Sequence, residues 1–106
     1  MSMQQAYFAV IFTSQRTPEG GESYEEMSRR MVELAAIQPG YISIESARGP
    51  DGVGITVSYW ESLEAIRAWK AQVEHQVAQA RGRSDWYTWY RIRVCRVEDE
   101  YDFGRT

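Results

Sequence analysis

Residues 59–90, YWESLEAIRAWKAQVEHQVAQARGRSDWYTWY, indicate the fold of this 106-residue chain more clearly than any other stretch. Apolar side chains recur in this stretch at the three- and four-residue spacing of one helix face, and aromatic residues crowd both of its ends. Ser62 is typical of a helix start and Gly82 of a helix stop. The stretch therefore predicts a helix over 62–81 with a strand on either side.

The remaining elements follow from changes in periodicity and from turn residues. Residues 5–14, QAYFAVIFTS, carry apolar side chains on both alternating faces, which predicts a central strand covered on both sides. Ser23 and Glu26 match a capping box, and Pro39-Gly40 marks the end of the helix that follows it. The sequence GPDG at 49–52 is a turn signal. The predicted strands are therefore 5–14, 41–48, 53–60 and 85–98, and the helices run from Ser23 to Pro39 and over 62–81.

The order strand, helix, strand, strand, helix, strand predicts an α+β protein of the ferredoxin-like type, with a four-stranded antiparallel sheet. The length is that of one domain, 1–106. Two helices can cover only one face of such a sheet, yet the first strand has Phe8 and Val10 on one side and Ala9 and Ile11 on the other. We therefore expect a second copy of the chain to cover the other face, which makes the protein a homodimer.

The composition excludes several classes of function. Fifteen acidic and twelve basic residues give a net charge of −3, and the basic residues are scattered, so no nucleic-acid surface is expected. One cysteine, Cys95, excludes an internal disulfide and is typical of a reducing compartment. With one histidine and no glycine-rich phosphate loop, neither a metal site nor a nucleotide cofactor is expected. No apolar run has membrane-spanning length, so we expect a cytoplasmic protein that does not bind membranes.

The segments YWES, AIRAW, VEHQVAQARGR and WYTWYRIRVCRVE together resemble the antibiotic biosynthesis monooxygenase superfamily over nearly the whole chain. The resemblance implies a dimeric α+β barrel in which two sheets pack face to face and each subunit keeps a pocket between its helices and its own sheet. It also implies a cofactor-independent monooxygenase that acts on a small electron-rich aromatic compound of the phenol, quinol or anthrone type. The alternative is a non-catalytic homodimer that binds such a compound.

Binding or degradation of haem is a third hypothesis. Haem-degrading members of the superfamily share an asparagine, a tryptophan and a histidine about ten residues after the tryptophan. This sequence contains no asparagine. If Trp69 stands for the tryptophan, Gln79 lies ten residues beyond it and His75 only six. We therefore expect the protein to use neither haem nor any other cofactor.

Five side chains are the candidate site residues. His75 is the candidate catalytic residue, because histidine is the side chain whose ordinary pKa lies near neutrality. On an unbroken helix it lies away from the apolar face, whereas a helix break near Lys70 would turn it inward. Both positions are compatible with the sequence. The predicted substrate-binding residues are Trp69, Tyr59, Tyr90 and Trp86.

Alternation along the strands assigns side chains to the two faces of the sheet. Tyr59 shares its side with three apolar residues, which favours the helix side. In the last strand the set predicted to face the helices is Trp86, Tyr90, Ile92 and Val94, and the set predicted to face away is Tyr87, Trp89, Arg91, Arg93 and Cys95. For Arg91 and Arg93 we favour structural ion pairs with carboxylates such as Glu45. Cys95 is interpreted as a packed residue and not as a nucleophile.

Overall fold

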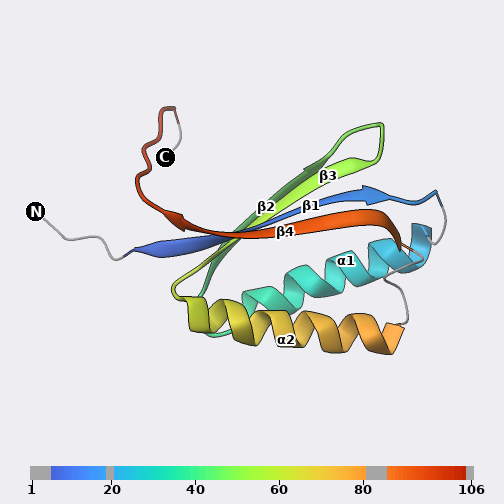
Figure 1. Ribbon diagram of the computed structural model, residues 1–106, viewed down its shortest axis with the longest axis horizontal. Helices are drawn as coiled ribbons and strands as arrows, with labels where there is room; N and C mark the ends of the chain where they lie inside the picture. The colour runs from blue at the N-terminus through green and yellow to red at the C-terminus, as the bar shows by residue number, and fades with distance from the viewer. Residues whose placement is uncertain (1–5, 19–20, 81–85, 105–106) are drawn as a thin grey trace, which may run out of the picture.

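The computed structural model describes residues 6–18, 21–80 and 86–104 and contains four strands and two helices within them. These elements are β1 (Tyr7–Arg16), α1 (Gly21–Ala36), β2 (Tyr41–Arg48), β3 (Val53–Trp60), α2 (Leu63–Ala80) and β4 (Tyr87–Val97). The strands pair antiparallel in the order β2-β3-β1-β4. Both helices lie on the same side of the sheet (Figure 1). The predicted ferredoxin-like α+β fold is confirmed.

The hairpin of β2 and β3 forms where the turn signal predicts it. Gly52 has a φ of 86°, a conformation in which a residue with a Cβ atom is strained. Its amide donates to the carbonyl of Gly49 at 3.0 Å, and the Asp51 carboxylate accepts a hydrogen bond from the amide of Val53 at 3.0 Å. These local bonds determine the bounds of both strands, which match the prediction.

The two helix starts differ in how well the sequence predicts them. Ser62 precedes α2, and its hydroxyl accepts a hydrogen bond from the amide of Ala65 at 3.0 Å, as an N-cap residue does. The capping box predicted at Ser23 is wrong, because α1 already begins at Gly21 and Ser23 lies in its first turn. The Ser23 hydroxyl instead accepts a hydrogen bond from the Trp86 indole at 2.9 Å.

The core lies between the sheet and the two helices. Trp60 and Ala35 are completely buried and Ile66 nearly so, and Phe8 and Val10 of β1 pack against them. Phe8 and Val10 therefore identify the helix face of the sheet. The strand register places the following residues on that face: Phe12 and Ser14 of β1, Ile44 and Arg48 of β2, Gly54, Thr56, Ser58 and Trp60 of β3, and Tyr90, Ile92 and Val94 of β4.

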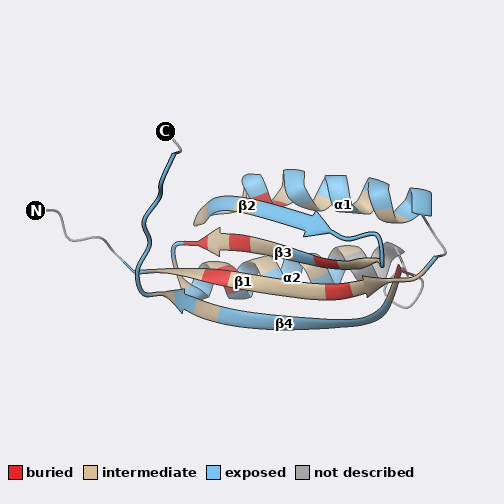
Figure 2. Ribbon diagram, turned by 90° about the horizontal axis from the view of Figure 1, so that it is seen from above, coloured by how far each residue is buried: buried red, intermediate tan, exposed pale blue. Residues whose placement is uncertain are grey.

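We call the opposite side of the sheet the open face, because no helix of the described chain covers it (Figure 1). Its residues are Tyr7, Ala9, Ile11, Thr13 and Gln15 of β1, Ser43 and Glu45 of β2, Val53, Ile55, Val57 and Tyr59 of β3, and Trp89, Arg91, Arg93 and Cys95 of β4. Ile55 and Trp89 are 48% and 42% exposed. Figure 2 shows that β4 is exposed over most of its length. The predicted division of β1 between two faces is confirmed.

Two predicted side-chain positions are wrong, and one suggested ion pair does not form within the chain. Tyr59 lies on the open face, where its ring contacts Tyr7 at a centroid distance of 6.1 Å. Tyr87 turns toward the helices, because the register with β1 shifts between Gln15 and Arg16. Within one chain Arg91 and Arg93 do not pair with Glu45, because β3 and β1 separate their strand from β2.

Candidate functional site

The helix side of the sheet carries two aromatic clusters. In the tryptophan cluster, Trp69 of α2 stacks on Trp60 at a centroid distance of 5.6 Å, and Tyr41 of β2 meets Trp60 edge-on at 5.7 Å. The Trp60 indole donates to the Ser58 hydroxyl at 2.9 Å, so its polar atom is satisfied in the core. Trp69 thus lies on the side of α2 that faces the sheet, as its helical spacing predicts, and it packs against the core.

The tyrosine cluster lies at the other end of the same side and consists of Phe12, Tyr24, Trp86, Tyr87 and Tyr90. Phe12 contacts the rings of Tyr87 and Tyr90, each at a centroid distance of 5.4 Å. Tyr24 of α1 contacts Trp86 at 6.2 Å and Tyr87 at 5.8 Å. The predicted residues Trp86 and Tyr90 therefore belong to one cluster, and Trp69 belongs to the other.

Arg48 is held beneath the tyrosine cluster by a glycine. The residues Arg48, Gly54, Ser14 and Tyr90 form one row across the sheet. A Cβ atom on Gly54 would lie 2.6 Å from the guanidinium carbon of Arg48, so the guanidinium rests where a side chain would otherwise stand. From there it donates to the buried Ser14 hydroxyl at 3.1 Å and to the Tyr24 hydroxyl at 3.2 Å. The absence of a side chain at Gly54 thus makes room for a cation on the helix face.

Tyr24 of the tyrosine cluster contacts two guanidinium groups. It accepts hydrogen bonds from Arg48 and from the Tyr87 hydroxyl. The guanidinium of Arg16 lies 3.8 Å from the centre of the Tyr24 ring and donates to the Trp86 carbonyl at 2.6 Å. Within the described residues no acceptor takes the Tyr24 proton, and the one ion pair there joins Arg96 to Glu98 instead of engaging either cation. The geometry leaves Tyr24 as a hydrogen-bond donor next to two positive charges.

Burial is the main cause that raises the pKa of the Tyr87 phenol, and the neighbouring Tyr24 adds to the rise by its charge and by its hydrogen bond. Arg48 and Arg16 act in the opposite direction and lower it. Tyr87 therefore stays protonated and remains a donor to Tyr24 at neutral pH.

Along β4, apolar side chains that begin with Tyr90 of the tyrosine cluster remain open to solvent. Tyr90, Ile92 and Val94 face the helices, yet 36%, 49% and 49% of their surfaces are exposed. Large apolar side chains that face the helices are normally buried. This strip of β4 is therefore apolar surface available to a ligand. Tyr90, at one end of the strip, contacts Tyr87, which in turn contacts Tyr24.

The structure does not bring His75 or Tyr59 to these clusters. α2 runs from Leu63 to Ala80 without a break, so the alternative in which a break turns His75 inward is wrong. His75 is exposed, and six residues at 100° each place it about 120° around the helix from Trp69. Tyr59, on the open face, donates to Glu45 at 2.9 Å. Its pKa is raised, first by burial and then by that hydrogen bond.

Sequence reasoning missed Ser14, Arg16, Tyr24, Arg48 and Tyr87. Arg16 and Arg48 are the last residues of β1 and β2, and an arginine at a strand end is ordinarily expected to point into solvent. Tyr24 lies within the amphipathic pattern of α1 and was therefore expected to be a packing residue. One signal was readable: Gly54 interrupts the strand 53–60, and a glycine inside a strand often marks a close approach by another group.

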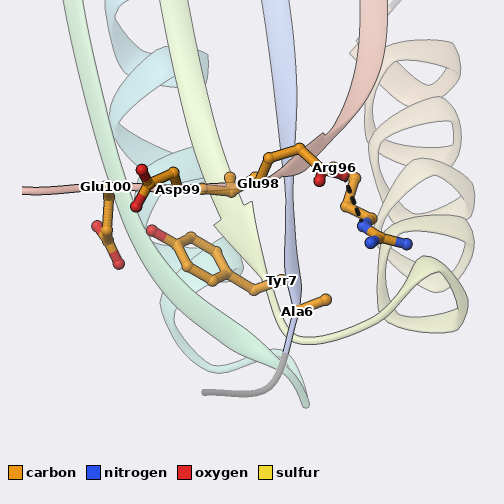
Figure 3. A pocket seen from close by; sticks show the side chains of 7 residues that line it. Ala6, Tyr7, Arg96, Glu98, Asp99 and Glu100 are labelled. Carbon is orange, nitrogen blue, oxygen red and sulfur yellow. Dashed lines mark ion pairs between the residues drawn. The ribbon is translucent and has the colours of Figure 1, made fainter. Parts of the chain in front are cut away.

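A cleft of about 180 Å³ lies apart from the clusters, at the end of the sheet where β4 leaves it (Figure 3). Tyr7, Arg96 and the acidic residues 98–100 line it. One half-buried phenol among carboxylates offers no flat apolar platform, so we do not consider this cleft the candidate site. In the described parts of the chain no three metal-ligating side chains come together, and no helix has the length and apolarity needed to span a membrane.

Comparisons with known proteins agree with this architecture. The family model for antibiotic biosynthesis monooxygenases matches residues 7–81. An uncharacterised protein of Bacillus subtilis strain 168, YqjZ, is 51% identical over 92 residues, which cover 87% of this chain and 80% of that protein. SnoaB, a cofactor-independent oxygenase from Streptomyces nogalater, superposes with a TM-score of 0.65 at 15% identity over 96% of this chain and 100% of its own. A protein of unknown function from Nitrosomonas europaea superposes with a TM-score of 0.74 at 8% identity over 95% and 98% of the two chains.

Proposed function

Because the chain belongs to the antibiotic biosynthesis monooxygenase family, we propose that it is a cofactor-independent monooxygenase that acts on a small electron-rich aromatic compound of the phenol, quinol or anthrone type. The observation that supports this proposal is the half-exposed apolar strip of Tyr90, Ile92 and Val94 on the helix face, whose Tyr90 belongs to the same aromatic cluster as Tyr24. The strip suits a flat ring, and the Tyr24 hydroxyl suits an oxygen atom on that ring.

The proposed reaction needs an electron source, which is the substrate itself. After loss of a proton, the electron-rich ring reduces O₂; one oxygen atom enters the substrate as a carbonyl and the other leaves as water, with two hydrogens taken from the substrate. The protein must stabilise the substrate anion and exclude water. Tyr24 donates a hydrogen bond to the anionic oxygen, and the charges of Arg48 and Arg16 strengthen that interaction.

The experiment is oxygen uptake with a panel of phenols, quinols and anthrones in the presence of a metal chelator. Turnover of at least one class is expected. Tyr24→Phe should lower the rate by about tenfold or more, the effect of one hydrogen bond to developing charge. Tyr41→Phe, which removes a hydroxyl from the tryptophan cluster, is the matched control and should leave the rate nearly unchanged. Absence of uptake with the whole panel contradicts the monooxygenase proposal.

The role of His75 as proton acceptor stays a prediction of the sequence. If His75 is the general base, His75→Ala should lower turnover by about a hundredfold or more while the melting temperature is kept. Unchanged oxygen uptake in the folded variant would exclude the role. The exposure of His75 favours the second candidate function, a homodimer that binds the aromatic compound without turnover. Quenching of tryptophan fluorescence by a compound that causes no oxygen uptake would support that function.

We also propose that the protein is a homodimer joined through the open faces of two sheets. Val53, Ile55, Val57 and Tyr59 of β3 form an apolar set on this face, and Ile55 is half exposed in the single chain. Apolar sheet surface of this kind is normally covered, and a two-fold dimer covers it with an identical surface.

A further inference from the structure

The guanidinium groups of Arg16 and Arg48 lie beside Tyr24 and are held there by neutral partners. Arg48 donates to the completely buried Ser14 hydroxyl at 3.1 Å and to the Tyr24 hydroxyl at 3.2 Å. Arg16 donates to the carbonyl of Trp86 at 2.6 Å. Within the described ranges, every group that accepts a hydrogen bond from either guanidinium is a carbonyl or a hydroxyl, and no carboxylate forms an ion pair with them. The described contacts therefore fix the positions of both cations without neutralising their charges.

Both charges act on the tyrosine cluster. The guanidinium carbon of Arg16 lies 3.8 Å from the centre of the Tyr24 ring, and that of Arg48 lies 5.7 Å from it. Burial raises the pKa of Tyr87, and both guanidiniums act against that rise. A guanidinium that is already held in position presents a planar fork of donors, which matches the shape of a carboxylate. An acidic group is therefore the substituent that this part of the site favours.

The apolar strip of β4 begins close to the Arg48 guanidinium. Arg48, Gly54, Ser14 and Tyr90 form one row across the sheet. The guanidinium occupies the space beside Gly54 and reaches the hydroxyl of Ser14, and Ser14 pairs directly with Tyr90 of β4. Neighbouring strands lie about 5 Å apart, so the guanidinium is within about 10 Å of Tyr90. A fused ring system that starts at the guanidinium therefore extends to the strip.

We propose that the site takes an aromatic acid, a compound whose electron-rich ring carries a carboxylate next to its oxygen substituent. The carboxylate pairs with Arg48, and Arg16 adds the attraction of a second positive charge. The ring oxygen accepts a hydrogen bond from Tyr24, because the Tyr24 hydroxyl lies only 3.2 Å from an Arg48 nitrogen and two adjacent donors suit two adjacent acceptors. The ring extends from there toward Tyr90. This inference rests on the proposed function and names the class of substrate within it.

The test is equilibrium dialysis at neutral pH with two compounds of nearly equal shape, 3-hydroxy-2-naphthoate and 3-hydroxy-2-naphthamide. Only the first carries a charged carboxylate. The wild-type protein should bind the acid about tenfold or more tightly than the amide, the effect of a hydrogen bond between charged groups. Equal affinity, tighter binding of the amide, or binding of neither compound overturns the inference.

Two variants test whether the preference comes from the placed guanidinium. Arg48→Met removes its charge. Gly54→Ala keeps the charge but puts a Cβ atom 2.6 Å from the guanidinium carbon. The atoms that must then move are the far end of a flexible side chain, so the fold should be kept while the guanidinium is displaced. Both variants should bring the two dissociation constants close to each other. A preference for the acid that survives in either variant overturns the inference.

Arg29→Met is the matched control, because it removes the same charge from another surface. Arg29 is exposed on α1, and five residues at 100° each place it about 140° around the helix from Tyr24. This variant should keep the wild-type preference for the acid. A preference that disappears here as well would show that the net charge of the protein, and not the position of Arg48, selects the ligand, which also overturns the inference.

Oxygen uptake with the same two compounds and with neutral phenols separates this inference from the proposed function. Selective binding of the acid without any uptake contradicts the monooxygenase and supports the aromatic-acid site. Turnover of neutral phenols by a protein that binds acid and amide equally contradicts the aromatic-acid site alone.

Discussion

At the scale of single residues, Tyr87 makes the stability of the protein depend on alkaline pH. Its pKa is raised in the folded state, mainly by burial, so the folded protein keeps the phenol proton at pH values where the unfolded chain loses it. The stabilising effect is therefore complete below about pH 10, the ordinary tyrosine pKa, and is lost as the pH rises further. Urea unfolding of the wild type and of Tyr87→Phe should show a stability difference that shrinks between pH 8 and pH 11. A difference that stays constant over this range would contradict the assignment.

The residue scale is also where sequence reasoning reached its limit. Alternation along β3 correctly divides Tyr59 from Trp60, but it does not say which face the helices cover. The apolar set that includes Tyr59 suggested the core, whereas the helix-facing set contains Gly54, Thr56 and Ser58. Small and polar residues are needed there because the Arg48 guanidinium and the Trp60 indole occupy the space. The more apolar face of β3 is therefore not the face that the helices cover, because Arg48 and Trp60 fill the space on the helix face.

At the scale of elements, Gly40 controls how closely the start of α2 approaches the connection between α1 and β2. Its φ is 84°, and an added Cβ atom would lie 2.6 Å from the Cβ of Ala65, which cannot rotate away. Gly52 has nearly the same φ, 86°, but there the nearest atom is the flexible Gln15 amide. Gly52→Ala should cost about 1–2 kcal/mol for the backbone strain alone. Gly40→Ala should cost more, because α2 must move, and chemical unfolding of both variants measures the difference. Equal losses would show that α2 has room at this contact.

Elements with their own local signals were predictable, and those that depend on distant contacts were not. β2 and β3 were predicted with their observed bounds, because the turn at Gly52 is encoded by adjacent residues. The start of α1 was misplaced, because Ser23 matches a capping pattern while its hydroxyl bonds to Trp86, 63 residues away. The same holds for the candidate site: of its aromatic residues only Trp86 and Tyr90 were predicted from the sequence, whereas Arg48 is brought to Tyr24 by the register of three strands.

At the scale of the whole molecule, the half-exposed Ile55 and Ile92 lie on opposite faces of the sheet, and they allow the two proposed surfaces to be tested separately. Ile55 is 48% exposed on the open face, and Ile92 is 49% exposed on the helix face. Because each is already half in water, replacement by glutamate disturbs the single chain to a similar and modest degree. Differences between the two variants therefore report the surface each residue faces.

Ile55→Glu should convert the dimer to a monomer in sedimentation, because two carboxylates would be buried near each other at a two-fold interface. Ile92→Glu should remain a dimer and lose binding of flat aromatic compounds, because the charge lies on the apolar strip next to Tyr90. A monomeric Ile92→Glu together with a dimeric Ile55→Glu would mean that the copies meet through the helix side, and the aromatic strip would then be an interface instead of a ligand site. Since the two variants carry the same substitution at equal exposure, general loss of stability cannot produce opposite outcomes.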